Sequence, residues 1–285
     1  PGRRLGHPSG ARGPRAASVS ELRRLRPPAV AGSFYPGDAA ALRSAIERSF
    51  ADARPADADA PVPKALVVPH AGYVYSGPVA ATGFARLLPG RRTIRRVVLL
   101  GPSHRVPVRG LGLSGADLWR TPLGDVTVDH DDDQALLDLS AVVVDDAAHA
   151  PEHSLEVQVP FLQSVLDEFR LVPVIVGDAS AHEVASVLDL LWGGPETLVV
   201  ISTDLSHYHP HQDAVRLDAR TAAAIVACDR AAVGDRDACG ARPLRGLLAA
   251  AVERDLAVEP LDLRTSGDTA GDTRSVVGYG TFALT

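Results

Sequence analysis

Short apolar runs alternate with amphipathic stretches along most of the chain. Apolar runs that are bounded by turn residues predict buried strands. They lie at residues 64–69, 95–104, 170–177, 196–210, 257–265 and 275–285. Stretches with apolar residues at helical spacing predict helices. They cover about residues 39–50, 77–88, 131–140, 154–169, 181–192, 211–227 and 240–253.

This alternation of strands and helices predicts an α/β fold. We expect a single domain over residues 27–285, with a central, mostly parallel or mixed sheet that is flanked by helices. Asp38 follows a Pro-Gly turn and is expected to cap the first helix, whereas Pro160 is expected to kink the helix at 154–169. Residues 1–26 are basic and rich in Gly, Pro, Ala and Arg, which predicts a disordered tail.

The composition is that of an ordinary globular protein, and it narrows the classes of function. Hydrophobic residues make up 46% of the 285 positions, and charged residues make up 22%. The formal net charge of −6 gives no reason to expect nucleic-acid binding. We find no apolar run long enough to span a membrane and no glycine cluster with the spacing of a nucleotide-binding loop. With two cysteines and no signal-like apolar region, we expect a cytoplasmic protein without disulfides.

Three of the predicted strands end in the same way, with an apolar run that is followed by a histidine. His70 follows "LVVP", His104 follows "VVLLGPS", and Asp204 and His207 follow "LVVIST". In open α/β sheets, ligands bind beyond the carboxyl ends of the strands. Imidazole is a good ligand for iron, copper, nickel and zinc. A single strand-end histidine is more often structural, but three in one chain predict a shared site.

A further cluster lies in "HAPEHSLE", residues 149–156. His153 and Glu156 are three residues apart at the start of a predicted helix, so we expect them to share a face. One interpretation is that an acidic side chain meets the helix dipole. The other is a carboxylate–histidine pair that faces the sheet ends. His209 and His211 flank a proline and are expected at the surface.

The two cysteines have different surroundings. Cys228 lies on the apolar face of a predicted helix and is expected in the core. Cys239 lies just before the next predicted helix, and a helix N-terminus lowers the pKa of a thiol. We therefore expect Cys239, of the two, to be the reactive thiolate.

Several sequence motifs after about residue 26 resemble those of one known family and occur in the same order. They include "RPPAVAGSFYPG", "PHAGYVYSGPVAA", "LLGPSHRVPVRGLGLS", "EHSLEVQVPFLQ", "STDLSHY" and "DTRSVVGYGTFAL". The chain resembles the Memo family, whose prokaryotic members are called AmmeMemoRadiSam system protein B. This resemblance implies a fold similar to that of class III extradiol (LigB-type) dioxygenases, which bind non-haem Fe(II) through two His and a Glu. It also implies AMMECR-type and radical SAM proteins as partners.

The resemblance further implies a pocket that binds iron or copper. Carried over by motif, it implies His70, His104 and Cys239 as metal ligands. A thiolate then stands where the non-haem iron oxygenases use a carboxylate. His207 is implied as the acid/base residue, and Asp204 as a group that lines the same pocket and orients a ligand. Other residues of these motifs that are expected in the pocket are His153, Glu156, Tyr73 and Ser103.

Three functions are compatible with these residues, and the sequence leaves open whether the chain is an enzyme. The first is a metal-dependent redox protein with dioxygenase-like chemistry on an unknown small molecule. The second is a binding or adaptor protein that uses the same pocket for a peptide or a partner. The third is a metal-free hydrolase with Cys239 as nucleophile, which ranks last because no feature specifies an oxyanion hole. We expect no nucleotide cofactor, no nucleic acid and no membrane partner.

Overall fold

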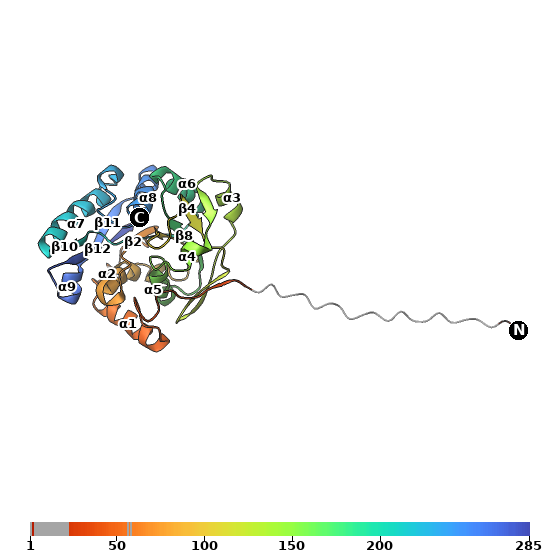
Figure 1. The fold of residues 1–285 in the computed structure, drawn as a ribbon, viewed down its shortest axis with the longest axis horizontal. Helices are drawn as coiled ribbons and strands as arrows, with labels where there is room; N and C mark the ends of the chain where they lie inside the picture. Colours follow the sequence, from red (N-terminus) through yellow and green to blue (C-terminus); the bar gives the residue numbers. More distant parts are fainter. Residues whose placement is uncertain (1, 3–22, 56, 58) are drawn as a thin grey trace.

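A mixed β-sheet runs through the centre of the computed structural model, which describes residues 2, 23–55, 57 and 59–285. Neighbouring strands follow the order β11 (Val258–Thr265), β12 (Val276–Leu284), β2 (Ala65–Val68), β9 (Thr197–Ser202), β3 (Arg96–Pro102), β8 (Arg170–Val176), β4 (Leu111–Leu113) and β7 (Val142–Val144). β10 (His207–His209) pairs with the beginning of β12. β2, β9, β3 and β8 are parallel, whereas β12 and β4 join them in antiparallel orientation. The predicted α/β fold with a mixed sheet is confirmed (Figure 1).

Helices cover both faces of this sheet (Figure 1). One face packs against α1 (Ala39–Ala51), α2 (Tyr73–Ala85) and α5 (Val159–Val165). The other face packs against α6 (Ala181–Leu191), α7 (His211–Val226) and α8 (Ala241–Glu253). Side chains alternate along a strand, so Leu66 and Val68 of β2 join the first layer, whereas Ala65 and Val67 join the second. Burial on both faces explains why the central strands are continuous apolar runs.

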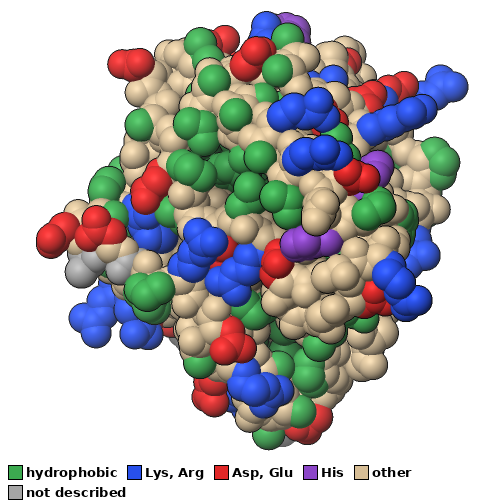
Figure 2. All heavy atoms as spheres, turned by 90° about the vertical axis from the view of Figure 1, so that its left-hand side faces the viewer, with side chains coloured by type: hydrophobic (Ala, Val, Ile, Leu, Met, Phe, Trp, Pro, Cys, Tyr) green, Lys and Arg blue, Asp and Glu red, His purple; other side chains and the backbone are tan. Residues whose placement is uncertain are grey.

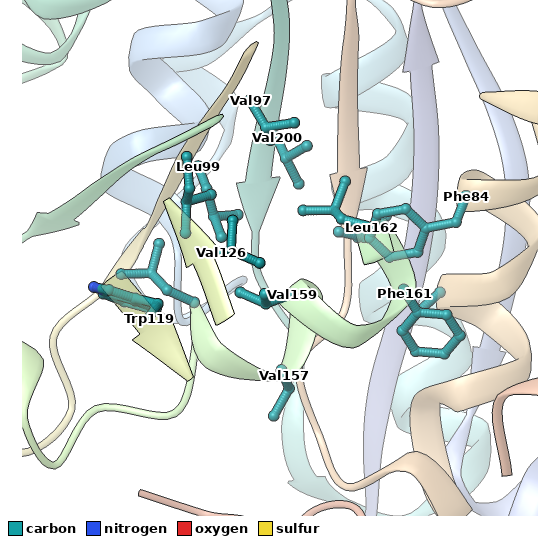
Figure 3. Packing of buried hydrophobic residues seen from close by; sticks show 14 of the residues in the cluster. Phe84, Val97, Leu99, Trp119, Val126, Val157, Val159, Phe161, Leu162 and Val200 are labelled. Atoms are coloured by element: carbon teal, nitrogen blue, oxygen red, sulfur yellow. The ribbon is translucent and has the colours of Figure 1, made fainter. Parts of the chain in front are cut away.

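Aromatic rings of α2 and α5 pack together within the first layer (Figure 3). The rings of Phe84 and Phe161 stack with their centroids 5.2 Å apart and an interplanar angle of 10°. The predicted helix at 154–169 is shorter in the structure, where the 3-10 turn η2 (Glu156–Gln158) precedes α5. Pro160 therefore lies in the first turn of α5, where its missing N–H costs nothing, and it does not kink a longer helix.

Shorter elements complete the fold. β1 (Leu25–Arg26), β5 (Leu118–Thr121) and β6 (Gly124–Thr127) form a separate sheet. The other short elements are α3 (Asp133–Leu137), α4 (Asp146–His149), α9 (Ser266–Ala270), η1 (Leu88–Gly90) and η3 (Arg230–Ala232). The predicted cap of α1 is confirmed, because Asp38 Oδ1 accepts the backbone N–H groups of Ala40 (3.0 Å) and Ala41 (2.9 Å). α2 begins at Tyr73, earlier than the predicted start at residue 77.

The face in Figure 2 carries acidic and basic side chains intermixed around apolar ones, without a continuous basic stripe. Among the helices of the described residues, none combines the length and apolarity that crossing a bilayer requires.

A buried ion pair ties Arg26, the last residue of β1, to the rest of the domain. Arg26 Nη1 lies 2.7 Å from Glu156 Oε2, and both side chains are almost fully buried. The Glu156 carboxylate also accepts the Tyr35 hydroxyl (2.6 Å) and two backbone N–H groups. Since Arg26 is part of the folded domain, the tail boundary after residue 26 is corrected to an earlier position. Within the predicted tail, residue 1 and residues 3–22 lie outside the described residues, so the disorder predicted for them stays a prediction.

We predict that Glu156→Gln destabilises the fold strongly. The amide would leave the guanidinium of Arg26 buried without its counter-charge, which costs about 3 kcal/mol in comparable sites. Chemical denaturation of both proteins measures the difference in the free energy of unfolding. Glu168→Gln is the matched control, because the Glu168 side chain is 90% exposed and should contribute less than about 1 kcal/mol. Equal stability of the two variants would contradict this role for Glu156.

His149, at the end of α4, is a buried histidine with one unpaired nitrogen. Its Nε2–H donates to the carbonyl of Gly112 (3.0 Å), whereas Nδ1 has no hydrogen-bond partner among the described groups. Burial lowers the pKa of His149 to about 4. The ring is therefore neutral at pH 7, and protonation would place an uncompensated charge in the interior.

We predict that this histidine makes the fold sensitive to acid. The unfolded chain protonates His149 near pH 6.5, whereas the fold does so only near pH 4. Stability is therefore lost as the pH falls below 6.5. Compared with His149→Gln, the wild-type chain should lose about 2 kcal/mol more between pH 7 and pH 5, as urea unfolding would measure. The same substitution at the exposed His182 is the control, and identical losses in wild type and His149→Gln would rule the effect out.

Candidate metal centre

Three strand ends meet at one edge of the central sheet. β2, β9 and β3 are adjacent and parallel, which confirms that the predicted strands are neighbours. His70 follows β2, Asp204 follows β9 and His104 follows β3. The strand ends are also joined directly, because Asp204 Oδ1 accepts the backbone N–H of His70 (2.7 Å). This edge is the place where open α/β sheets bind ligands.

Three histidines converge just beyond these strand ends. His153, from the loop between α4 and η2, joins His70 and His104. One potential ligand nitrogen from each ring lies within 4.8 Å of those of the other two. The ring centroids are 5.2 Å apart for His70 and His104, 5.6 Å for His70 and His153, and 4.7 Å for His104 and His153. Three imidazoles at this spacing could hold one metal ion.

A chain of buried hydrogen bonds places the proton of His70. Ser202 Oγ donates its single proton to the carbonyl of Ser154 (2.6 Å) and accepts Nε2–H of Gln158 (2.7 Å). His70 Nδ1 lies 2.9 Å from the same oxygen, so this nitrogen must be the donor. Burial lowers the pKa of His70 well below its ordinary value. The ring is therefore neutral, and its Nε2 carries a lone pair.

Glu152 places the proton of His104 in the same way. Its Oε1 accepts the ring Nδ1–H of His104 (2.9 Å), and its Oε2 accepts the backbone N–H of that residue (2.6 Å). Burial alone would raise the pKa of Glu152, but the hydrogen bonds from His104 and Ser154 outweigh burial and lower it. In the neutral ring of His104, the lone pair is then on Nε2. A carboxylate on the second nitrogen of a histidine is typical of metal sites.

His153 carries a nitrogen with no hydrogen bond. Its buried Nδ1 lies 3.2 Å from Glu152 Oε1, yet it forms no hydrogen bond with any described group. Burial lowers the pKa of His153 to about 4, and the charges of His104 and Arg105 act in the same direction. The ring packs against Phe34, with centroids 4.5 Å apart. Buried polar atoms are seldom left without a partner, so this nitrogen fits a site that receives a further group.

Cys239 lies against His70 immediately before α8. Its Sγ is 3.1 Å from His70 Nε2 and accepts the backbone N–H of Asp204 (3.2 Å). The next residue, Gly240, lets the chain pass close to the end of β9, because a Cβ there would lie 2.7 Å from Thr203 Cβ. The prediction that Cys239 has a lowered thiol pKa is wrong, since burial and the nearby Asp204 raise this pKa to about 12. Burial thus outweighs the helix N-terminus, and the S–H donates to His70 Nε2.

Asp204 and His207 occupy different positions in the site. Asp204 is 5% exposed, and burial raises its pKa to about 6. Its bond to the backbone of His70 makes it a group that positions this histidine. His207 begins β10 and donates Nδ1–H to the carbonyl of Leu205 (2.8 Å), because a carbonyl can only accept. In the neutral ring, Nε2 of His207 can therefore accept a proton.

A cleft of about 1050 Å³ contains these groups. Its lining includes the predicted residues His70, His104, His153, Asp204, His207 and Cys239. The other predicted pocket residues do not line it. The Tyr73 hydroxyl donates to the carbonyl of Val157 (2.7 Å), and Ser103 Oγ donates to a carbonyl of its own loop (2.5 Å). Glu156 is held by Arg26, and His153 lies in a loop, so these two predicted neighbours share no helix face.

Sequence patterns did not reveal every residue of the site. The lining also includes Phe34, Tyr75, Arg105, Tyr208, Arg236 and Tyr279. Glu152 and Ser202 orient the rings of His104 and His70 from behind. Glu152 belongs to the cluster at residues 149–156 that the sequence indicated, whereas Ser202 was missed and could have been recognised from its position at the end of an apolar strand. The aromatic residues come from separate segments, and no local pattern marks them.

Comparison with known proteins decides the family. A family model described as "Memo-like protein" matches residues 26–283. The chain belongs to the Memo family. This confirms the resemblance that the motifs indicated. A MEMO1 family protein of Methanopyrus kandleri is 40% identical over 284 residues, with 89% of this chain and 96% of that protein covered.

Other relatives of this Memo-family chain are similar over nearly their whole length. MEMO1 family proteins of Sulfolobus acidocaldarius and Thermotoga maritima are 38% and 39% identical, over 280 and 274 residues. These matches cover 90% and 89% of this chain, and 97% of each relative. Among solved structures, an uncharacterized protein of Escherichia coli K12 has a TM-score of 0.49 at 15% identity, covering 76% of this chain and 98% of that chain.

We predict that the tautomers of two histidines in this Memo-family site are set independently. Nitrogen NMR of labelled imidazoles in the protein without added metal should show Nδ1–H for both His70 and His104. Glu152→Ala should remove this preference at His104 only, and Ser202→Ala at His70 only, because each loses the acceptor of one ring. Each variant is the control for the other. Unchanged tautomers in both variants would contradict these assignments.

Proposed function

We propose that this protein binds one iron or copper ion and uses it for redox, dioxygenase-like chemistry on a small organic molecule. One observation carries the proposal: three imidazole nitrogens lie within 4.8 Å of one another at the carboxyl ends of parallel strands. Among the described residues, these three histidines are the one group of three or more potential ligands whose donor atoms all lie this close together. Hydrogen bonds already hold the far nitrogens of His70 and His104, which supports a ligand role for both rings.

The donor set supports a redox-active transition metal. We propose His70, His104 and His153 as ligands, since imidazole suits iron and copper and the Nδ1 of His153 lacks another partner. Cys239 is proposed as an additional ligand because its Sγ lies 3.1 Å from His70 Nε2. Its thiol would have to lose its proton to serve in this role. When bound, the ion would supply one-electron chemistry and a Lewis-acid site for oxygen atoms of O₂ or a substrate.

Other residues of the cleft would bind and orient the substrate and move protons. The Nε2 of His207 would accept a proton from a substrate hydroxyl, because its Nδ1–H is committed to the carbonyl of Leu205. Asp204 would keep His70 in place through the backbone N–H of that residue. The rings of Phe34 and Tyr75 line the same cleft and would exclude water from a bound molecule.

Metal content tests this proposal. Protein purified without an affinity tag, then exposed anaerobically to Fe(II) or Cu(I) and desalted, should retain about one ion per chain. His70→Ala, His104→Ala and His153→Ala should each lower the affinity by at least about tenfold. Cys239→Ser should weaken binding but keep the ion at saturating metal. His182→Ala, which changes an exposed histidine, is the matched control and should retain the ion.

Two results would contradict parts of this account. No metal after either loading, or equal metal content in wild type and His70→Ala, would contradict a metal centre at this site. Loss of metal in Cys239→Ser with full retention in His153→Ala would contradict His153 as a ligand and make the thiolate the third donor. Elemental analysis by mass spectrometry, after gel filtration, measures each case.

A further inference from the structure

We infer that the cleft binds a small organic anion, with a carboxylate or phosphate group on an apolar body, through Arg105 and Arg236. Both residues line the cleft that contains the three histidines. The inference rests on the proposed function, because this anion would be the substrate class of the same site.

The two arginines have no partner within the described part of the protein. Both residues are exposed, and neither forms an ion pair or a side-chain hydrogen bond with a described residue. A guanidinium presents a planar fork of N–H donors that matches the oxygens of a carboxylate or a phosphate. Both groups are therefore available to an anion that enters the cleft.

The acidic residues of the cleft do not neutralise these arginines. Asp235 is ion-paired with Arg245, and Asp272 is paired with Arg274 at 3.0 Å, and both of these arginines lie outside the cleft lining. Asp204 is buried, and its carboxyl group accepts the backbone N–H of His70. The lining thus carries two unpaired arginines against one buried carboxylate, and its exposed unpaired charges are positive.

The position of these charges suits a ligand of the histidine cluster. Arg105 directly follows His104 in sequence, and its charge acts on His153. Arg236 precedes Cys239 by one short turn. The whole chain has a formal net charge of −6, so the sign of the charge is locally reversed in the cleft. A cleft of reversed sign attracts small anions that much of the surface repels.

Aromatic rings of the lining favour an apolar body on this anion. Phe34, Tyr75 and Tyr208 all line the cleft. Tyr208 is 77% exposed and has a φ of 62°, a left-handed conformation that is costly for a bulky residue. A shift in the pairing register between His207 and His209 accompanies this conformation. Strain of this kind is kept at sites where a side chain must be presented, and here it presents the Tyr208 ring at the cleft.

Calorimetric titration of the full chain, treated with a chelator, tests the inference without a metal. Hexanoate and phenyl phosphate are the anionic probes, and hexanamide and phenol are their neutral counterparts. We expect each anion to bind at least about tenfold more tightly than its counterpart, and we expect high salt to weaken it. Arg105→Gln and Arg236→Gln should each weaken anion binding by about tenfold. Arg230→Gln removes an exposed charge outside the cleft and should bind like the wild type.

The outcomes separate this inference from the proposed metal centre. Tighter binding of hexanoate than of phenyl phosphate would identify a carboxylate as the preferred group, and the reverse order would identify a phosphate. Absence of anion binding, equal binding of anions and neutral probes, or an equal loss in Arg230→Gln would overturn the inference. Because the protein is free of added metal, such a failure would leave the metal content of wild type and His70→Ala as an independent test.

Discussion

Parallel hydrogen bonding between β2, β9 and β3 is the constraint on which the candidate site depends. Val68 of β2 pairs with Ser202 of β9, and Leu100 of β3 pairs with Ile201, so the three strands end close to one level. His70, Asp204 and His104 follow these strand ends within a few residues. A slip of one residue would turn these side chains to the other face of the sheet and would disperse the cluster. The apolar cores on both faces make such a slip costly, so the same packing that stabilises the fold sets the geometry of the site.

Burial of so many polar groups is costly, and the structure offsets that cost with few, heavily used acceptors. Glu152 accepts four hydrogen bonds, from the ring and backbone of His104 and from the backbone of His153 and Ser154. Ser202 orients His70 without any charge. Burial keeps His70 and His153 neutral and Cys239 protonated. His70, His153 and Cys239 are therefore neutral donors held by a fixed frame, and two unpaired arginines line the same cleft.

The sequence was sufficient for features that depend on local patterns. Apolar runs located the central strands, and the histidines at their ends indicated which edge of the sheet carries the site. Features that depend on distant partners were not accessible. Glu156 is bound by Arg26, far earlier in the chain, so its spacing from His153 wrongly predicted a shared helix face. The same contact places Arg26 inside the domain and not in the tail. For Cys239, the local signal of a helix N-terminus was real, but burial by surrounding elements outweighed it.

X-ray absorption at the edge of the bound metal tests the central claim most directly, which is that His70, His104 and His153 enclose one ion. For protein loaded with Fe(II) or Cu(I), the account predicts a first shell with three imidazole nitrogens, and a sulfur contribution that disappears in Cys239→Ser. His153→Ala should lose one imidazole from that shell. A shell of oxygen atoms alone, or the same imidazole signal in wild type and His153→Ala, would contradict it.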